Sequence, residues 1–472
     1  MKAPDRARRA GHVAASYWSA WPLFCLMACV AACQESGSGA SAPSPDVGEA
    51  TPEDSARDDV GSDVREPGEE EPAYTWYRDI APLLETHCGA CHLEGGQGVG
   101  DFFDRSVVRA FMPAILSAVR AGRMPPPASD PDCHPYVNAD RWTLPSDFNQ
   151  RLEGWSSAGF PDGDPADAVV VPPLPVGLDS PDLEVRLPAP YRPTFSDPRN
   201  PGNEYRCFVV EHGRSEPFAI RAMAPIIDRP ELVHHIVLFK ARRADVPAQN
   251  DPVRGYDCID MTFFVGSGGG AELLTGDSGM ISAWAPGSQA VVFSDGAGIR
   301  MDPDHVFILQ MHYFDAGEGE VQADLSGYAF ETVPRVRTQI IMAPFGPTGF
   351  RIPAGDDAYH RELRVTLPVP IRVHGVMPHM HYLGRSYHMW FRRGEHETCV
   401  VRSERYDFDN QLTYMFEEPI AVPAGAEIGF ACTWNNSESN PNLFHRPPIE
   451  IGYGERTDEE MCFGFALVSI GR

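Results

Sequence analysis

Two histidines near the C-terminus, His379 and His381, are separated by a single residue. Side chains two positions apart share a face of an extended strand, so these imidazoles can offer nitrogens to one metal ion. The surrounding run is His374-Gly-Val-Met-Pro-His379-Met-His381-Tyr-Leu-Gly384, which has no hydroxyl nucleophile with a base and no phosphate-binding glycine loop. Metal chemistry is therefore the first interpretation. An isolated His-x-His is more often a solvated pair unless a third ligand converges on it.

Further histidines occur in two apolar runs expected to be strands. His234 and His235 are adjacent within Val233-His-His-Ile-Val-Leu-Phe239, and His312 ends Val306-Phe-Ile-Leu-Gln-Met-His312. Neighbouring residues on a regular strand face opposite ways, so the pattern leaves open whether both histidines of the pair bind one metal. By itself, His312 is more typical of a core histidine.

A different chemistry is indicated by Cys88-Gly-Ala-Cys91-His92. This spacing is that of c-type haem attachment, in which two thiols bind the vinyl groups and the following imidazole ligates iron. Met124, in Gly-Arg-Met-Pro-Pro-Pro, resembles the distal methionine of small cytochromes c, although it could be a core methionine. A rival hypothesis joins Cys88 and Cys91 to Cys133 and His134 in a zinc site, which leaves His92 unexplained.

The N-terminus has the layout of a secretory signal: basic residues, an apolar run too short to span a membrane, and small residues before Cys33. Val30-Ala-Ala-Cys33 resembles a bacterial lipobox, which implies acylation of Cys33; the alternative is an ordinary signal peptide. From Gln34 to about residue 71 the chain lacks large apolar residues and is expected to be a disordered tether.

Composition predicts a mainly β protein with more than one core. The chain has 472 residues, 45 Pro, 43 Gly and a net charge of −27. The length suits about three domains, and the turn-forming residues favour many short strands. The negative charge opposes binding to nucleic acid or to anionic lipid through a basic patch, so the only membrane contact expected is through the lipid anchor.

Several motifs occur in an order that resembles the copper type II ascorbate-dependent monooxygenases, the family of peptidylglycine α-hydroxylating and dopamine β-type enzymes. The resemblance covers about residues 196–470. It rests on His234-His-Ile-Val-Leu238, Ala283-Trp-Ala-Pro-Gly287, Leu309-Gln-Met-His-Tyr313, Asp324-Leu-Ser-Gly327, His379-Met-His-Tyr-Leu-Gly384 and Thr457-Asp-Glu-Glu-Met-Cys462.

This resemblance implies two successive β-sandwich domains with one copper each. On matching positions, His234, His235 and His312 would bind the electron-transfer copper, and His379, His381 and Met461 would bind the catalytic copper that activates O₂. A thioether is a soft ligand that favours Cu(I), so the second set suits copper better than zinc, magnesium or calcium. The alternative is that Met461 is an ordinary buried core residue.

The family pattern also suggests two disulfides, Cys207 with Cys258 and Cys432 with Cys462. Cys133 and Cys399 are left over, and their spacing does not decide whether they pair. Where peptide-amidating members hold a peptide carboxylate with Arg, Asn and Tyr, this chain has Met377, Phe463 and Phe465. These side chains cannot form a guanidinium clamp, so an apolar or aromatic small molecule is the expected substrate class.

We therefore expect an extracytoplasmic, lipid-anchored copper monooxygenase with a fused haem c domain. O₂ and a C–H bond of a small organic substrate would react, with electrons from ascorbate or a redox protein. The alternative is a non-enzymatic copper and haem electron carrier. The expected segments are a signal peptide (1–33), an acidic linker (34–72), a small α-helical cytochrome c-like domain (73–166), a Pro-rich connector (167–195) and two antiparallel, jelly-roll-like β-sandwich copper domains (196–335 and 336–472).

Overall fold

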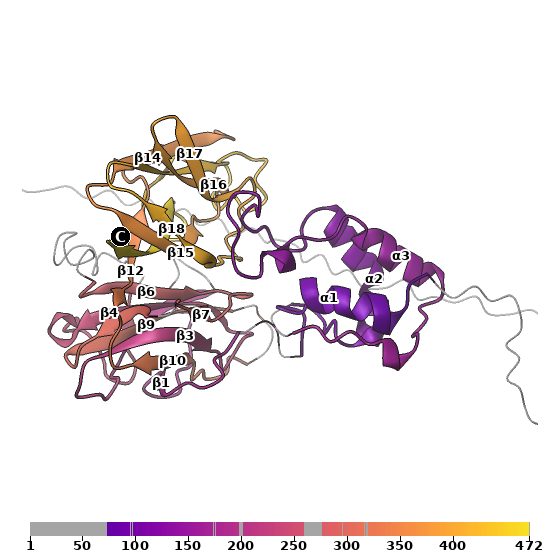
Figure 1. Ribbon diagram of the computed structural model, residues 1–472, viewed down its shortest axis with the longest axis horizontal. Coiled ribbons are helices and arrows are strands. Elements are labelled where there is room, and N and C mark those ends of the chain that lie inside the picture. Colours follow the sequence, from indigo (N-terminus) through magenta and orange to yellow (C-terminus); the bar gives the residue numbers. More distant parts are fainter. Residues whose placement is uncertain are drawn as a thin grey trace, which may run out of the picture. The chain divides into compact units, whose positions relative to one another are not determined.

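The computed structural model describes residues 73–471, apart from 95, 97, 173, 175, 198–201, 259–275, 295, 316 and 318–319. The predicted signal peptide, its lipobox at Cys33 and most of the linker lie outside the described residues. Among the described helices, none has both the length and the apolar content needed to cross a bilayer. The prediction of a mainly β chain is confirmed: strands dominate, and helices are few (Figure 1).

Apart from a short 3-10 helix, η4 (Arg243–Asp245), the described helices lie between residues 76 and 167. They are η1 (Trp76–Ile80), α1 (Ala81–His87), α2 (Arg105–Arg120), η2 (Ala139–Trp142), α3 (Phe148–Ser157) and η3 (Pro165–Asp167). Helix α2 begins where the Asp104 carboxylate accepts a hydrogen bond from Ser106 N at 2.7 Å, which is a typical N-cap. Its buried face, Val108, Met112 and Ile115, has helical spacing and packs in one core with Leu84 and Trp155.

The first sandwich is built from two sheets. One has the order β1 (Leu183–Arg186), β10 (Gly327–Val333), β3 (Phe218–Ile226), β8 (Ala297–Met301) and β11 (Thr338–Gln339), with β7 (Val291–Val292) beside β3. The other has the order β5 (Tyr256–Asp257), β2 (Asn203–Val210), β9 (His305–Phe314), β4 (Val233–Arg242) and β6 (Gly279–Trp284). Pairing is antiparallel except between β11 and β8. The first strand falls within the predicted connector.

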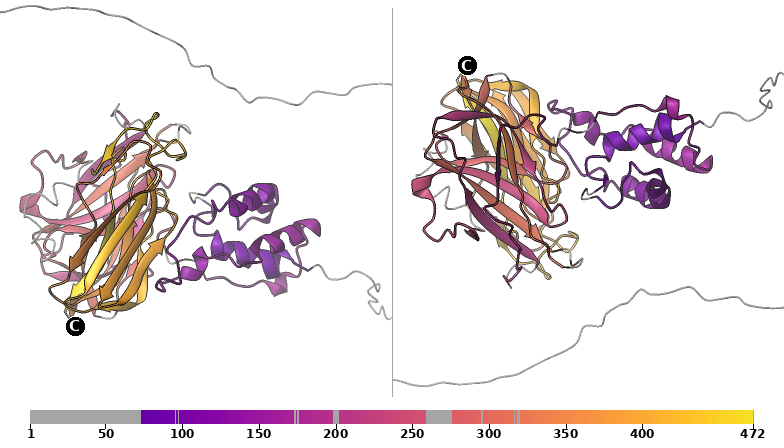
Figure 2. Two further views of the ribbon diagram at one scale, coloured as in Figure 1. Left: turned by 90° about the horizontal axis from the view of Figure 1, so that it is seen from above. Right: turned by 90° about the horizontal axis from the view of Figure 1, so that it is seen from below.

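The second sandwich follows directly. Its two main sheets have the orders β12 (Ile341–Phe345), β21 (Phe463–Ile470), β15 (Ile371–His379), β18 (Tyr414–Val422), and β14 (Tyr359–Thr366), β19 (Glu427–Trp434), β16 (Gly384–Arg393), β17 (His396–Ser403). A short pair joins β13 (Arg351–Ile352) to β20 (Ile451–Gly452). These strands are the orange and yellow arrows lying side by side in Figure 2. The buried strands are rich in β-branched and aromatic residues, as sheets prefer.

A segment between α2 and α3 packs against the second sandwich rather than in the helical core. Tyr136 is 3% exposed and belongs to the same core as the sandwich strands. Ser129 N donates to Tyr414 Oη at 2.9 Å, and Asp130 pairs with Arg402 at 2.5 Å. Because a chain segment that buries an aromatic side chain resists detachment, this segment anchors the helical part to the strands that follow.

Three disulfides are present among the described residues, joining Cys207 to Cys258, Cys432 to Cys462 and Cys133 to Cys399. The first two confirm the predicted pairs. The third decides what the spacing left open, and it overturns the zinc alternative because a sulfur bonded to Cys399 is no longer a thiolate ligand for the Cys88 and Cys91 pair. Three disulfides indicate an extracytoplasmic compartment.

Candidate metal centres

The adjacent pair His234 and His235 lies where strand β4 departs from regular pairing. The register of β4 against β9 shifts between Val233 and His235, and His235 is paired with His312. A bulge of this kind re-aims one side chain relative to its neighbour. Both side chains of the adjacent pair can therefore face one metal ion.

The three imidazoles meet through the same ring nitrogen. Nδ1 of His235 is 3.2 Å from Nδ1 of His234 and 3.3 Å from Nδ1 of His312. All three residues can offer ligand atoms within 4.8 Å of one another. Two nitrogens bound to one ion at about 2.0 Å each lie roughly 3.3 Å apart in a tetrahedral arrangement. The spacing therefore fits a single metal ion.

The outer nitrogens of this cluster have polar partners. Nε2 of His312 is 2.8 Å from Asn203 Oδ1, and Nε2 of His234 is 3.2 Å from Asp409 Oδ1. An oxygen acceptor on Nε2 places the ring proton there and leaves the Nδ1 lone pair free for a metal. Burial, followed by the neighbouring imidazoles, lowers the pKa of His235 and of His312 well below the usual range. A proton is therefore disfavoured between these nitrogens near neutral pH.

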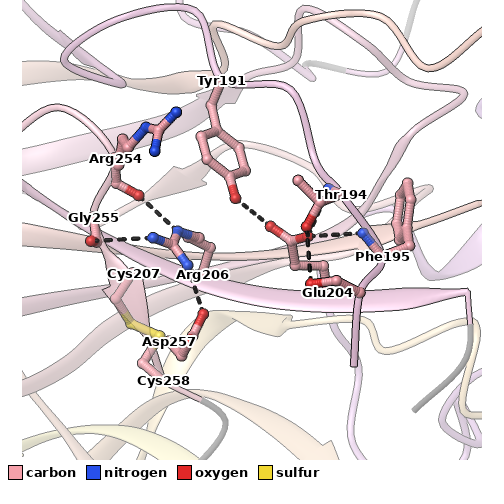
Figure 3. Close-up of polar contacts among 11 residues, drawn as sticks. Tyr191, Thr194, Phe195, Glu204, Arg206, Cys207, Arg254, Gly255, Asp257 and Cys258 are labelled. Carbon is pink, nitrogen blue, oxygen red and sulfur yellow. Dashed lines mark hydrogen bonds and ion pairs between the residues drawn. A yellow bond between two sulfur atoms is a disulfide. The ribbon is translucent and has the colours of Figure 1, made fainter. Parts of the chain in front are cut away.

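Strand β2 supports the cluster with both of its faces. Tyr205 stacks on His312 with ring centroids 4.1 Å apart, and it shares a face with Asn203. On the opposite face, Glu204 accepts hydrogen bonds from Thr194 N and Phe195 N and from the Tyr191 hydroxyl (Figure 3). These contacts hold the strand that orients His312.

Arg206, on the same face of β2 as Glu204, is also held by fixed hydrogen-bond partners. Arg206 donates to the carbonyls of Arg254 and Gly255 and to Asp257 at 2.5 Å, next to the Cys207–Cys258 bridge (Figure 3). A guanidinium with several fixed acceptors loses less entropy per bond than a flexible ammonium. The strand behind the three-histidine cluster is therefore rigid.

His379 ends β15 and His381 lies two residues beyond it, with their ring centroids 5.1 Å apart. Nδ1 of His379 is 2.5 Å from Gln411 Oε1, and Nδ1 of His381 is 2.9 Å from the Glu459 carbonyl. Both partners are acceptors, so both Nε2 lone pairs remain available for a metal. Burial lowers the pKa of His379 to about 4 and that of His381 to about 3, so both rings are neutral at pH 7.

Met461 follows a buried carboxylate that ties its segment to His381. Glu460 is fully buried and accepts hydrogen bonds from His381 N at 3.0 Å, Leu383 N at 2.7 Å and Trp434 Nε1 at 2.9 Å. Burial raises the Glu460 pKa to about 8, although the hydrogen bonds from these donors act to lower it. Met461 itself is 4% exposed, and the next residue forms the Cys432–Cys462 bridge. Met461 is thus buried and is flanked in the chain by a residue that contacts the His381 backbone and by a disulfide-bonded cysteine.

The residues in the positions of the peptide clamp lie beside His379. Strand pairing sets Met377 against Phe465 and His379 against Phe463. The Phe465 ring centroid is 5.9 Å from that of His379. All three of these apolar side chains are buried, so the strand residues next to His379 offer no charged partner for a carboxylate.

The two imidazole sets are close neighbours. Phe408, 4% exposed, has its ring centroid 6.0 Å from that of His234 and 5.8 Å from that of His381. The influence of His379 and His381 on the His235 pKa is a second sign of this proximity. Phe408, Asp409, Gln411 and Glu460 were not predicted as site residues, because the turn that contains the first three carries no recognisable motif and Glu460 is one acid among several.

The Cys-x-x-Cys-His motif directly follows α1. Cys88 and Cys91 are free thiols, whereas the other six described cysteines form disulfides. Nδ1 of His92 is 3.1 Å from the Val99 carbonyl, which leaves Nε2 for a ligand bond, and Phe102 stacks on the ring at 4.2 Å. Two neighbouring thiols that stay unpaired beside formed disulfides fit thioether attachment of haem. Met124 is 40% exposed, so it is not a core methionine.

Taken together, the sandwiches and the three-histidine cluster define a β-sandwich protein with a candidate metal centre. Residues 359–467 match the family model "Copper type II ascorbate-dependent monooxygenase, C-terminal domain". The chain is 27% identical over 295 residues to "DBH-like monooxygenase protein 1" of Mus musculus, covering 57% of this chain and 44% of the relative. For the Gallus gallus protein of the same name the identity is 26% over 287 residues, covering 55% and 42%.

Residues 359–467 are therefore similar to the C-terminal domain of the copper-dependent monooxygenases, and the longer matches are to DBH-like proteins. The matched region spans less than half the length of those relatives. Among solved structures, allantoicase is 9% identical with a TM-score of 0.14, covering 49% of this chain and 78% of that one. A superposition of that quality does not indicate a shared fold.

Proposed function

We propose that the protein hydroxylates a C–H bond of a small organic molecule with O₂. One oxygen atom enters the product as a hydroxyl group and the other leaves as water, and the reaction consumes two electrons and two protons. The observation that carries this proposal is the convergence of three Nδ1 atoms, 3.2 and 3.3 Å apart, beside a second imidazole pair whose Nδ1 atoms have oxygen acceptors.

The ligand sets divide the work by their chemistry. His234, His235 and His312 would hold one copper, and His379, His381 and Met461 would hold the other. Bound copper supplies one-electron redox chemistry and reactivity toward O₂. An all-imidazole set suits both oxidation states, which favours electron transfer, whereas the thioether of Met461 favours Cu(I), the state that reacts with O₂.

The substrate class follows from the residues beside His379. Met377, Phe463 and Phe465 are buried, apolar and unable to bind a carboxylate by ionic pairing. Apolar side chains next to His379 favour an apolar or aromatic molecule over a peptide carboxylate, which would lack an ionic partner on these strands.

Copper stoichiometry joined to O₂ uptake tests this proposal. We expect two copper ions per chain and faster O₂ consumption by the reduced protein when a turned-over substrate is present, with hydroxylated product in equal amount. Two bound coppers with O₂ uptake that no member of an untargeted metabolite pool accelerates would instead favour a copper and haem electron carrier.

We further propose that residues 73–166 bind haem c and supply the electrons. Cys88 and Cys91 would hold the haem covalently, His92 would ligate the iron, and Met124 would be the second axial ligand. A tethered donor has an effective concentration in the millimolar range when its linker is short. His92→Ala should stop turnover with a protein reductant while ascorbate restores it; equal activity with every donor would contradict this role.

The same proposal includes a lipid anchor at Cys33, facing the periplasm or the cell surface. Its support is the small-residue run before Cys33 and the oxidised cysteines of the folded part. Cells fed a labelled fatty acid should label the wild-type protein and not the Cys33→Ser variant. Release of an unlabelled wild-type protein to the medium would contradict anchoring.

A further inference from the structure

A short turn between β17 and β18, residues 407–411, contacts both imidazole sets. The Phe408 ring lies near the rings of both His234 and His381, with centroid distances of 6.0 and 5.8 Å. Asp409 Oδ1 is 3.2 Å from Nε2 of His234, and Gln411 Oε1 is 2.5 Å from Nδ1 of His379. One turn of five residues therefore contacts a histidine of the first sandwich and two of the second.

The orientation of the Gln411 amide is fixed independently of His379. Its Nε2 donates a hydrogen bond to the Phe408 carbonyl at 2.8 Å, a group that can only accept. Oε1 must therefore be the atom that faces His379, and an amide oxygen can only accept. It follows that Nδ1 of His379 carries the proton and Nε2 carries the lone pair. The Gln411 side chain is 7% exposed, so water competes little for this bond.

Phe408 is buried and packs near both sets. It lies nearly parallel to His234, at an interplanar angle of 23°, and perpendicular to His381 at 89°. Tyr382 covers another side with its ring centroid 4.5 Å away. A buried aromatic ring packed this close limits the rotation of both imidazoles.

We propose that the 407–411 turn is a shared positioning element for both metal centres, with Gln411 setting the tautomer of His379 and Phe408 fixing His234 and His381 together. The turn itself needs no contact with substrate. The part that concerns copper rests on the proposed function, whereas the tautomer of His379 is a property of the metal-free protein. The two can therefore fail separately.

The first experiment uses the metal-free full chain labelled with ¹⁵N-histidine. Two-dimensional NMR of imidazole nitrogens should show His379 as the Nδ1–H tautomer, assigned by its loss in His379→Gln. Gln411→Leu removes the acceptor at similar volume and should shift His379 toward Nε2–H. Gln411→Glu keeps an acceptor oxygen and should preserve the Nδ1–H form. An unchanged tautomer in Gln411→Leu overturns the inference, whatever the protein does with copper.

The second experiment measures copper affinity by competition with a chromophoric Cu(I) chelator. Loss of an outer partner of a ligating histidine typically costs 10–100-fold in metal affinity. Gln411→Leu should lower the affinity for one of the two copper ions by about that factor, whereas Gln411→Glu should keep an affinity close to that of the wild type. Gln322→Leu is the matched control, because Gln322 is exposed and bonds only the Glu320 carbonyl in the described structure.

Variants of Phe408 test whether the turn positions both metal centres or only one. Phe408→Ala should change the Cu(II) electron paramagnetic resonance of both centres, and Phe408→Leu, which keeps the space filled, should change both less. Circular dichroism identifies a variant that fails to fold, in which case the milder Phe408→Leu decides. A change at one centre alone overturns the shared role. A wild-type chain that binds no copper defeats the proposed function, and with it the copper part of this inference.

Discussion

Nδ1 of His234 lies 3.2 Å from Nδ1 of His235, although the two residues are adjacent on one strand. The register shift of β4 at this point turns both rings to the same side, where His312 completes the set. The bulge is therefore a feature of the metal centre, as bulges beside functional sites commonly are.

This geometry predicts the effect of removing the third imidazole. His312→Ala should lower the copper content from two ions per chain to one, because two nitrogens bind a metal much less tightly than three. Elemental analysis after dialysis measures it. His360→Ala, which changes an exposed histidine on β14, should leave both ions. Retention of two tightly bound ions in His312→Ala would show that these residues do not form a centre.

Met461 allows the ligand role to be separated from packing. Met461→Leu conserves volume and should cost less than about 1.5 kcal/mol of unfolding free energy, yet it removes the thioether and should abolish hydroxylation. Met461→Ala should abolish it too, at a cost of about 2–5 kcal/mol for a buried site. Denaturant unfolding and product assays on both variants check this. Full hydroxylation by Met461→Leu would mean that Met461 is a core residue.

Covalent haem attachment predicts a chromophore that survives denaturation. Because thioether bonds join haem to Cys88 and Cys91, acid–acetone extraction should leave the colour with the protein. Met124→Ala should retain the haem but lower its reduction potential, since thioether ligation raises it. Loss of the colour on extraction contradicts c-type attachment, and an unchanged potential removes Met124 from the iron.

The Cys133–Cys399 disulfide joins residues 266 positions apart. Replacing both cysteines with serine should lower the free energy of unfolding by about 2–5 kcal/mol, because the unfolded chain loses a long-range constraint. Limited proteolysis should then cut near residue 130 first. Equal unfolding midpoints for the variant and the wild type would show that docking through Ser129, Asp130 and Tyr136 suffices without the bridge.

His374 predicts how stability depends on pH away from the metal centres. Burial, with a smaller effect of Arg372, lowers its pKa to about 4, and Nε2 is 2.9 Å from Ser469 Oγ. The unfolded state then binds the proton more readily, so stability is full above about pH 6.5 and falls as the pH drops toward 4, by at most about 3 kcal/mol from this residue. His374→Gln should flatten the slope between these values. An equal slope in both proteins contradicts this assignment.

Features set by residues close together in the sequence could be predicted from it. Features set by contacts between residues far apart in the sequence could not. Strand patterning and the Cys207–Cys258 and Cys432–Cys462 bridges were predictable through motif order. The convergence of His234 with His235 was not, because a bulge depends on pairing with β9. Gln411 and Phe408 had no distinguishing pattern, since their roles arise only where a turn of one sandwich reaches His234 of the other.

The docking of residues around Tyr136 on the second sandwich was likewise hidden. Polar and proline-rich stretches between helices look like ordinary loops until their partner is known. The same contact decides the pairing of Cys133, which sequence spacing left open.

The most direct test of copper-dependent hydroxylation is isotope incorporation from ¹⁸O₂. The copper-loaded, reduced protein is incubated under ¹⁸O₂ with an extracytoplasmic metabolite pool, and products are compared with those of Met461→Leu by mass spectrometry. Copper-dependent hydroxylation predicts a product with one ¹⁸O atom that forms with the wild type and is absent with the variant. Absence of any labelled product, or an equal yield of it from Met461→Leu, would contradict copper-dependent hydroxylation at this site.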